Sequence, residues 1–190
     1  MCVALVGHDR AMDWLTEAGL GLDNDILRLD HTTRRWVVVG LRLRDEIAEL
    51  LAGLAAGVEQ IGSSSVEGLL AKPIVDLAVG LAPEHHLAPV ADRLQGAGWI
   101  HRGDAGDRGG HVFVLETRPR HRVAHVHVVD HEGVQWRNYL RLRDVLRRNA
   151  DAREQYEAVK RRLTVECGDD RDAYTEGKTD VVRELLQRTD

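Results

Sequence analysis

The clearest hydrophobic pattern in the chain lies between residues 32 and 54. Apolar side chains recur there at steps of three and four residues: Trp36, Val39, Leu43, Ile47, Leu50, Leu51 and Leu54. This spacing puts them on one face of an α-helix, and Thr32 or Thr33 is suited to cap its N-terminus. We therefore expect a long amphipathic helix that packs on a sheet.

Four shorter apolar runs have the pattern of β-strands. They cover residues 58–61, 73–81, 111–116 and 123–129. The second run is almost continuously apolar, which is typical of a strand that is buried on both faces. The tract Arg-Pro-Arg-His-Arg between the last two runs indicates a hairpin connection.

The remaining pattern predicts further helices. We expect a short one near residues 66–71, one over 83–95, one around 136–146, one capped by Asp151, and a last one capped by Asp169 or Asp170 that runs to about Gln187. A polar, Gly-rich segment over 104–110 is the best candidate for a lid. The prediction is an α/β (α+β) domain over residues 31–190, with a mixed sheet of about four or five strands flanked by helices.

Residues 1–30 are expected to form an N-terminal extension packed on that domain. Residues 3–6 have the pattern of a short strand, Asp9 can cap a helix that ends near Gly19, and residues 26–29 suggest another turn. Nothing in this segment has the pattern of a chemical site.

Composition limits the class of protein. The chain has 190 residues, is 43% hydrophobic, and has no apolar run near the roughly 20 residues that cross a bilayer. Its N-terminus lacks a signal-peptide pattern, and Cys2 and Cys167 cannot form a disulfide framework. We expect a cytoplasmic protein without membrane contact. The net charge of −5 argues against nucleic-acid binding, and the oligomeric state is left open.

Lysine is rare in the chain. Among 26 Lys and Arg residues, the lysines are Lys72, Lys160 and Lys178. Lysine carries a compact point charge where arginine carries a planar fork, so these positions are candidates for sites that arginine does not suit. Residues 134–163 are rich in basic side chains, which fits either a solvated helical face or an anion site.

The stretch from Gln60 to Gly80 contains the strongest candidate chemistry. Asp76 lies within an apolar strand, where a carboxylate needs a partner such as Lys72, Arg143 or a metal ion. The turn at residues 62–65, Gly-Ser-Ser-Ser, supplies backbone N–H groups that can hold an anion. It is neither a phosphate loop of the GxxxxGK type nor a dinucleotide-binding GxGxxG turn. A Gly-Ser turn followed by a carboxylate on the next strand instead fits a nucleotidyltransferase arrangement.

A pair of histidines can extend that site. His125 and His127 are two residues apart in a predicted strand and therefore face the same side. With Asp76 they are candidate metal ligands, suited to Zn or Mn better than to Mg, although hydrogen-bonded packing is an equal alternative. Two-metal transfer needs further carboxylates, but residue 78 is Ala; Glu116 or Asp130 would have to supply one. Val129 excludes the three-histidine motif of histidine-triad hydrolases.

The C-terminal helices carry two further Tyr/Lys pairs. Tyr156 with Lys160, and Tyr174 with Lys178, are four residues apart and share a helical face. Either the lysine stem packs on the ring, or the ammonium groups reach the mouth of the site. Arg143 can bind a phosphate with two hydrogen bonds or pair with Asp76.

Several of these motifs together resemble the GrpB family, which is similar to the nucleotidyltransferase superfamily in fold. The resemblance covers roughly residues 32–188. It is carried by the segment Ile61–Val79, the strand His125-Val126-His127-Val128-Val129, the helix Leu142–Arg147, and the two Tyr/Lys pairs. Gln60 stands where the family usually has His, and Glu67 stands where it has Pro. The first change removes a titratable group and the second adds a negative charge near the expected phosphate site.

The resemblance and the residues lead to one main expectation: a metal-dependent nucleotidyl or phosphoryl transferase that uses a nucleoside triphosphate with Mg or Mn and a small anionic substrate. The expected catalytic residues are Asp76, His127, Lys72 and Arg143. The expected phosphate-binding residues are Gly62, Ser63, Ser64, Ser65, Lys72, Arg143, Lys160 and Lys178. The expected metal ligands are Asp76, His125 and His127. The alternatives are a non-catalytic binding or folding module, and a pocket that performs acid–base chemistry without a nucleotide.

Overall fold

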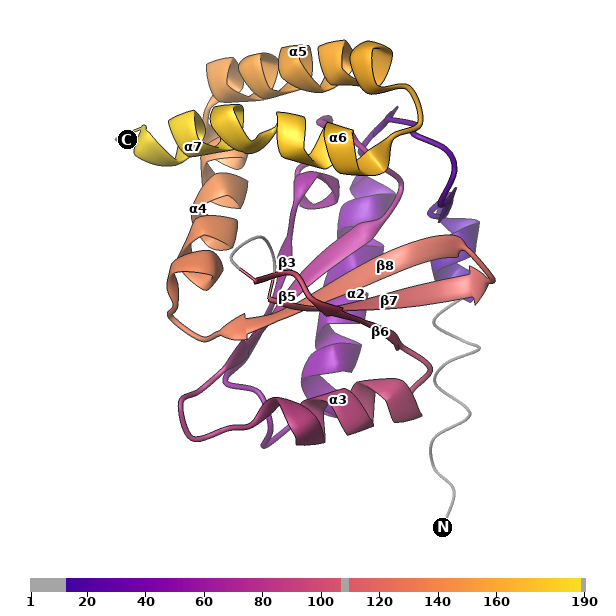
Figure 1. Cartoon of the computed structure of the whole chain (residues 1–190), viewed down its shortest axis with the longest axis vertical. Coiled ribbons are helices and arrows are strands. Elements are labelled where there is room, and N and C mark those ends of the chain that lie inside the picture. The colour runs from indigo at the N-terminus through magenta and orange to yellow at the C-terminus, as the bar shows by residue number, and fades with distance from the viewer. Residues whose placement is uncertain (1–12, 107–109, 189–190) are drawn as a thin grey trace.

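A mixed β-sheet forms the centre of the computed structural model, which describes residues 13–106 and 110–188 (Figure 1). Its strands lie in the order β3–β5–β8–β7–β6, and the two-residue strand β1 also pairs with β8. Strands β5 and β8 are parallel, whereas the other neighbours are antiparallel. The bounds are β1 Leu22–Asp23, β3 Gly57–Ile61, β5 Val75–Leu81, β6 Ile100–Asp104, β7 His111–Arg118 and β8 His121–Asp130.

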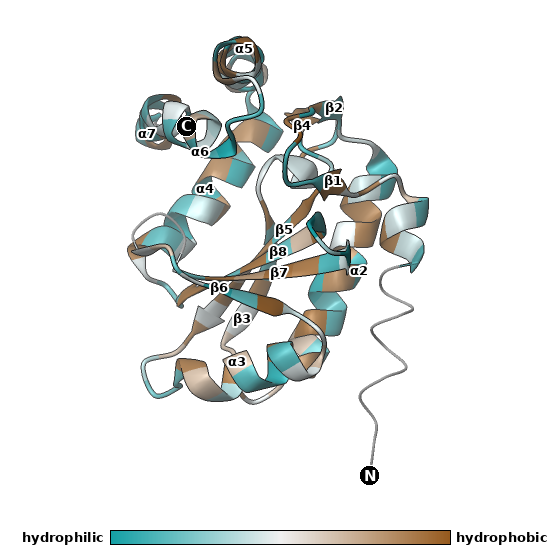
Figure 2. Cartoon of the chain, turned by 45° about the vertical axis from the view of Figure 1, so that its right-hand side comes forward, coloured by the Kyte–Doolittle hydropathy of each residue, from teal (hydrophilic) through white to brown (hydrophobic). Residues whose placement is uncertain are grey.

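Two helices cover one face of this sheet. They are α2, Arg34–Leu50, which is capped by the side chain of Thr33, and α3, Leu87–Gly96. The apolar stripe of α2, including Leu43 and Ile47, packs with Leu77 and Val126 of the sheet in the main hydrophobic core. In Figure 2 the central strands are largely brown while the helices alternate between brown and teal, as expected for buried strands beneath amphipathic helices.

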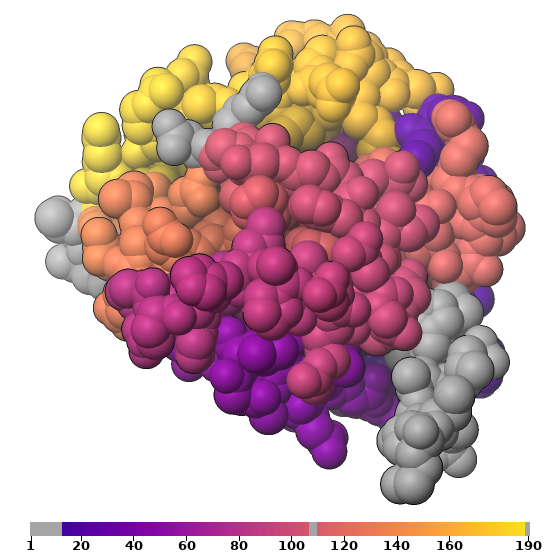
Figure 3. Space-filling view, turned by 60° about the horizontal axis from the view of Figure 1, so that its bottom comes forward, coloured from indigo at the N-terminus to yellow at the C-terminus, as the bar shows by residue number. Residues whose placement is uncertain are grey.

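The C-terminal helices form a layer on the other side. They are α4 Val134–Arg148, α5 Ala150–Cys167, α6 Arg171–Gly177 and α7 Thr179–Gln187. Helix α4 packs Trp136 against Ala78 and Ile61 of the sheet, and α5 and α7 pack in turn on α4. When the molecule is tipped so that its bottom comes forward, segments around α3 and β6 cover the middle of the surface and the C-terminal helices lie along its upper edge (Figure 3).

The structure confirms the predicted class and the mixed sheet, but it corrects several elements. Residues 66–71 are not a helix: a 3-10 turn, η1 Ser63–Ser65, is followed by β4 Leu70–Ala71, which pairs with β2 Asp30–His31. The sequence analysis missed β6 because its residues are mostly polar and it lies at the sheet edge. The last helix is broken at Lys178, and Asn149 rather than Asp151 caps α5.

The N-terminal segment contributes to the same core. Residues 13–17 are helical, and Leu15 and Leu20 are buried in the main hydrophobic cluster. The indole Nε1 of Trp36 donates to the carbonyl of Ala18 at 2.9 Å, which ties the segment to α2. The expected strand at residues 3–6, the cap at Asp9 and residues 107–109 of the suggested lid lie outside the described residues. Among the residues described, no helix is both long and apolar enough to span a bilayer.

Candidate functional site

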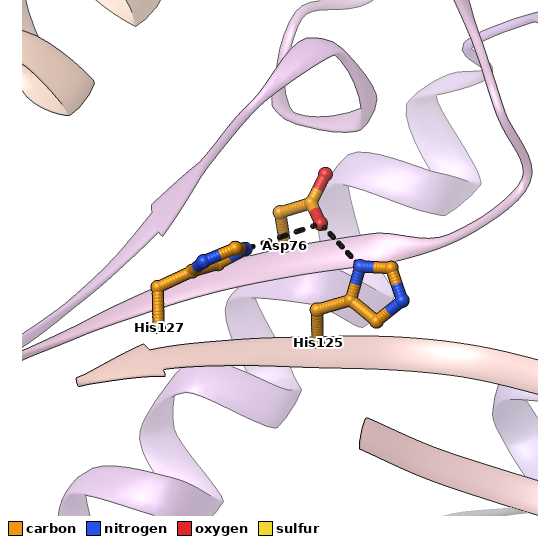
Figure 4. A group of neighbouring side chains, drawn as sticks. All are labelled: Asp76, His125 and His127. Atoms are coloured by element: carbon orange, nitrogen blue, oxygen red, sulfur yellow. Dashed lines mark hydrogen bonds and ion pairs between the residues drawn. The ribbon is translucent and has the colours of Figure 1, made fainter. Parts of the chain in front are cut away.

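Asp76 lies at the centre of the site because of strand register. The parallel pairing of β5 and β8 sets Asp76 beside His125 and sets Ala78 beside His127. Ring nitrogen Nδ1 of His125 lies 3.1 Å from Oδ1 of Asp76, and Nε2 of His127 lies 3.9 Å from the same oxygen (Figure 4). The partners of the Asp76 carboxylate are therefore imidazoles, whereas the sequence analysis had considered Lys72 or Arg143.

The environment keeps Asp76 ionised. Burial by itself raises the pKa of its carboxyl, but the interactions with His125 and His127 outweigh burial and bring the pKa below its ordinary value. Burial lowers the pKa of His125, although Asp76 opposes this shift. A neutral His125 can donate its Nδ1 proton to the carboxylate; in the other tautomer, with the proton on Nε2, the same Nδ1 can bind a metal ion.

The three side chains have the chemistry and spacing of a metal site. One ligand atom from each of Asp76, His125 and His127 can be chosen so that all lie within 4.8 Å of one another. Ligand bonds of about 2.1 Å hold neighbouring ligand atoms roughly 3–3.4 Å apart, so small side-chain movements would close the group around an ion. Two imidazoles and a carboxylate favour Mn, Fe or Zn over Mg.

The opposite ring nitrogens show what such a site would still need. His125 Nε2 and His127 Nδ1 are buried and have no hydrogen-bond partner among the described residues. Imidazoles that bind metals usually donate from the opposite nitrogen to an acceptor. Water would have to provide that acceptor here. Residue 78, which pairs with His127 in the sheet, is alanine and therefore supplies no second carboxylate.

The turn that precedes Asp76 requires glycine. Gly62 has φ of 70° and ψ of −177°, a combination that is essentially confined to glycine. A Cβ atom at residue 62 would lie 2.6 Å from Oδ2 of Asp76. The turn therefore packs directly against the carboxylate.

The serines of the turn have three different environments. Ser65 donates its hydroxyl to the carbonyl of Gly62 at 2.7 Å, so it closes the turn and does not line the cavity. Ser63 Oγ accepts a hydrogen bond from Lys160 Nζ at 3.1 Å. Ser64 Oγ is buried, has no partner among the described residues, and belongs to a residue that lines the adjacent cavity. Ser64 is thus the member of the turn with unused hydrogen-bonding capacity.

This cavity brings together most of the predicted site. It encloses about 70 Å³, enough for a phosphate-sized group or several waters, and it is too small for a whole nucleotide. Its lining residues are Ser63, Ser64, Ala71, Lys72, Asp76, Lys160, Tyr174 and Lys178. Every lysine of the chain is in this set, although the lysines come from three separate segments.

Two tyrosine rings hold the ammonium groups in place. Lys72 Nζ and Lys178 Nζ lie 4.4 and 4.6 Å from the centre of the Tyr174 ring. Lys160 Nζ lies 4.4 Å from the ring centre of Tyr156. These are cation–π distances, so the lysines both pack on rings and reach the cavity. The two readings of the Tyr/Lys pairs are therefore compatible.

Burial lowers the basicity of all three lysines. Burial brings the pKa of Lys72 and of Lys160 to about 7, and in each case the charge of Lys178 acts in the same direction. Burial also lowers the pKa of Lys178 to about 8, against the attraction of Asp76. Lys160 is the most enclosed, at 2% exposure, and donates to the carbonyl of Leu70 as well as to Ser63. An anion in the cavity would favour the charged form of all three.

Arg143 is not part of this cavity. Its Nη1 donates to Glu59 Oε2 at 2.8 Å and to the carbonyl of Gln60 at 3.1 Å, while its Nε donates to Asp144. Arg147, one helical turn later, donates to the carbonyl of Ser65 at 3.0 Å. Helix α4 thus holds the backbone on both sides of the turn, which places Arg143 among supporting residues and away from Asp76.

The two departures from the family pattern lie away from the cavity. Gln60 pairs with Leu77 in the sheet and its buried side chain meets Gly40 of α2, on the face opposite Asp76. Glu67 is exposed and does not line the cavity. Neither residue therefore changes the charge at the serine turn. The suggested extra carboxylates are also elsewhere: Glu116 pairs with Arg102 at 2.7 Å, and Asp130 is exposed at the end of β8.

Two arginines that act electrostatically on the site were not predicted from the sequence. Arg122 and Arg171 both lower the pKa of Lys72, after the larger effects of burial and Lys178. Arg122 is three residues before His125 in the same strand, a proximity that the sequence displays. Arg171 follows a helix cap, and no sequence signal connects it with Asp76.

Comparisons with known proteins identify the family. A family model described as GrpB protein matches residues 27–188. The chain belongs to the GrpB family. A UPF0157 protein of Streptomyces coelicolor is 39% identical over 154 residues, which are 81% of this chain and 79% of that protein. The glutamate-rich protein GrpB of Alkalihalophilus pseudofirmus is 31% identical and is covered over 98% of its length by 88% of this chain.

A solved structure shows the same GrpB fold. The crystal structure of the conserved protein GrpB from Enterococcus faecalis superposes with a TM-score of 0.71 at 24% identity, over 84% of this chain and 98% of that one. This likeness concerns the fold alone. This chain therefore has the fold of that GrpB protein, and its chemistry has to be argued from its own residues.

Proposed function

We propose that this GrpB protein is a metal-dependent nucleotidyl or phosphoryl transferase that acts on a small anionic molecule. The cavity would receive one phosphate group of a nucleoside triphosphate, and a divalent cation would be held by Asp76, His125 and His127. The mixed nitrogen and oxygen ligands make Mn²⁺ a better candidate than Mg²⁺. When bound, the cation would polarise the phosphate oxygens and neutralise part of their charge.

The observation that carries this proposal is the double position of Asp76. Its carboxylate interacts with both imidazoles and also lines the lysine cavity. The cavity therefore places one of the three candidate metal ligands beside the ammonium groups of the lysines, and phosphoryl transfer uses this combination of metal and cationic side chains. Ser64, another lining residue, has a buried hydroxyl without a partner among the described residues and could turn it toward a ligand.

The residues divide the work of the reaction. As the acceptor oxygen forms a bond to phosphorus, the bond from phosphorus to the leaving phosphate oxygen breaks, and negative charge grows on the leaving group. Lys72 and Lys178 face that charge and stabilise it. The acceptor proton passes to solvent or to His127. Because Nε2 of His127 is the nitrogen near Asp76, the same atom would serve as the metal ligand or as the base, so His127 takes one role or the other.

Thermal unfolding with ligands tests the proposal. The midpoint is measured with ATP, CTP, GTP and UTP, each with Mg²⁺, Mn²⁺ or a chelator, for the wild type and for Asp76→Asn. We expect at least one triphosphate to raise the wild-type midpoint further with metal than with the chelator, and expect Asp76→Asn to lose this metal-dependent rise. Equal stabilisation of the two proteins would refute the proposal.

One observation favours a second candidate, a non-catalytic module that binds a small anion. The site has a single carboxylate, because residue 78 is Ala, and the cavity has room for a phosphate-sized group only. Such a module would be stabilised by phosphate or a small carboxylate in the presence of the chelator, with no additional effect of nucleotide or metal. The same measurements separate the two candidates.

A further inference from the structure

Arg122 is a partly buried residue with an unused donor, in the same strand as His125. It is on β8, where it pairs with Leu22 of β1 and with Glu116 of β7. Its Nε is buried and has no hydrogen-bond partner among the described residues, because Oε1 of Glu116 is 3.7 Å away. A buried, unpaired guanidinium nitrogen is costly and indicates that a ligand or water completes the site.

Arg171 approaches the same region from the helical layer. It is the first residue of α6, and its Nη1 donates to the side-chain oxygen of Asn24 at 3.3 Å. Asn24 is neutral, so this hydrogen bond orients the guanidinium without neutralising it. Asn24 directly follows β1, whose Leu22 pairs with Arg122, so this hydrogen bond brings the Arg171 side chain toward Arg122. In line with this, burial lowers the pKa of Arg171 and the charge of Arg122 lowers it further.

The region concentrates positive charge around one carboxylate. Arg171 acts electrostatically on Lys72 and on Lys178, and Arg122 acts on Lys72 and on His125. Asp76 is the acidic residue that lines the cavity, where it faces three lysines. One phosphate in the lysine cavity would leave the two arginines only partly compensated. Glu116 is shared between Arg122 and Arg102. The charge of Asp172 acts on Arg171 but only partly offsets the effect of burial on its pKa. A ligand with two anionic groups would relieve the repulsion throughout the cluster.

We propose that Arg122 and Arg171 form a second anion subsite next to the lysine cavity, where their guanidinium groups bind a second oxyanion of the substrate. That oxyanion is a further phosphate of the triphosphate or a carboxylate of the acceptor; a guanidinium fork binds both with paired hydrogen bonds. Asn24 is a positioning residue for Arg171. This inference rests on the proposed function and specifies the substrate as a molecule, or pair of molecules, with two separated anionic groups.

Anion titrations of the full chain without metal test the subsite. Isothermal titration calorimetry in a chelating buffer compares orthophosphate, inorganic triphosphate and 3-phosphonopropionate. The variants are Arg122→Gln and Arg171→Gln, with Arg122→Lys to retain charge without the fork. Arg120→Gln is the matched control, because Arg120 is an exposed hairpin residue that pairs with Asp25. Thermal unfolding of each variant verifies that it is folded.

The subsite predicts a selective loss of affinity. Removing a charge-assisted pair of hydrogen bonds should weaken binding of the two-group ligands about tenfold or more, and change orthophosphate binding by less than about threefold. Arg122→Lys should recover part of the loss, and the control should bind like the wild type. If only triphosphate binding is weakened in the arginine variants, the subsite binds phosphate. If binding of 3-phosphonopropionate is weakened as well, the subsite also accepts a carboxylate.

Two results would overturn the inference. Equal losses for orthophosphate and the two-group ligands would show a general field effect, and unchanged affinities would show that the arginines bind no ligand. Because these titrations contain no metal, either result leaves the transferase proposal standing. That proposal fails separately, if Asp76→Asn keeps the metal-dependent stabilisation by triphosphates. Failure of the wild type to bind any of the three anions without metal also overturns the subsite, and leaves the metal-dependent transferase proposal to its own test.

Discussion

Lys160 allows a direct test of how burial acts on the lysine cluster. Its ammonium is 2% exposed and is held by the carbonyl of Leu70, the hydroxyl of Ser63 and the ring of Tyr156. These groups are neutral, so they only partly replace the water that solvates an exposed lysine. We predict that Lys160→Met changes the pH dependence of the free energy of unfolding.

The magnitude follows from the two pKa values. Burial lowers the pKa of Lys160 from 10.5 to about 7 in the folded protein, and the charge of Lys178 acts in the same direction. Between these values the unfolded chain binds more protons than the folded one, so stability rises with pH in this window and falls as the pH drops toward 7. From pH 7 to pH 9 the contribution of Lys160 amounts to roughly 2 kcal/mol.

Urea unfolding at pH 7 and pH 9 measures this contribution. The wild type should gain about 2 kcal/mol more than Lys160→Met over that interval. Arg162→Met on the same helix is the matched control, because Arg162 is exposed and pairs with Glu166. An equal gain in the wild type and Lys160→Met would show that Lys160 is charged in the folded protein at pH 9 and would refute the reasoning.

Three other changes probe the serine turn, the sheet and the cavity. Gly62→Ala should destabilise the fold by about 1–3 kcal/mol in urea unfolding and weaken Mn²⁺ binding, because the added Cβ would displace Asp76. Gly68 has φ of 81° and open space around it, so the control Gly68→Ala should leave metal binding intact. Gln60→Met should raise the unfolding free energy by about 1 kcal/mol, because it removes two buried polar atoms without partners, and a lower value would show that water satisfies them. Burial brings the pKa of Lys72 to about 7, so its charge is lost as the pH rises. Calorimetry should therefore show that the affinity for sulfate falls from pH 6.5 to 8.5 in the wild type, and falls less steeply in Lys72→Arg. A pH-independent affinity would contradict this expectation.

Hydrophobic periodicity predicted the elements that are buried by many apolar contacts. Helix α2 and strands β5, β7 and β8 were found because their burial imposes regular spacing over many residues. The edge strand β6 escaped prediction, since its sequence Ile-His-Arg-Gly-Asp has little apolar signal. Residues 66–71 resembled a helix locally, yet pairing between β4 and β2 across a long sequence separation decided their conformation.

The candidate site was predictable where sequence spacing fixes geometry. The two histidines share a strand face, and parallel register then places Asp76 beside them. The position of Arg143 was not predictable, because its ion pair with Glu59 depends on how α4 crosses β3. Arg171 was missed for the same reason: its contact with Asn24 joins two ends of the chain, and no periodic pattern encodes such a contact.

Binding of Mn²⁺ to the metal-free protein tests whether Asp76, His125 and His127 form a metal site. Electron paramagnetic resonance of a Mn²⁺ titration counts bound ions in the wild type, Asp76→Asn and His125→Gln, with Asp130→Asn as a control at the end of the same strand as the histidines. The account predicts one ion per chain in the wild type and in the control, with affinity lower by about tenfold or more in the other two variants. Absence of a bound ion in the wild type, or equal affinity in Asp76→Asn, would contradict it.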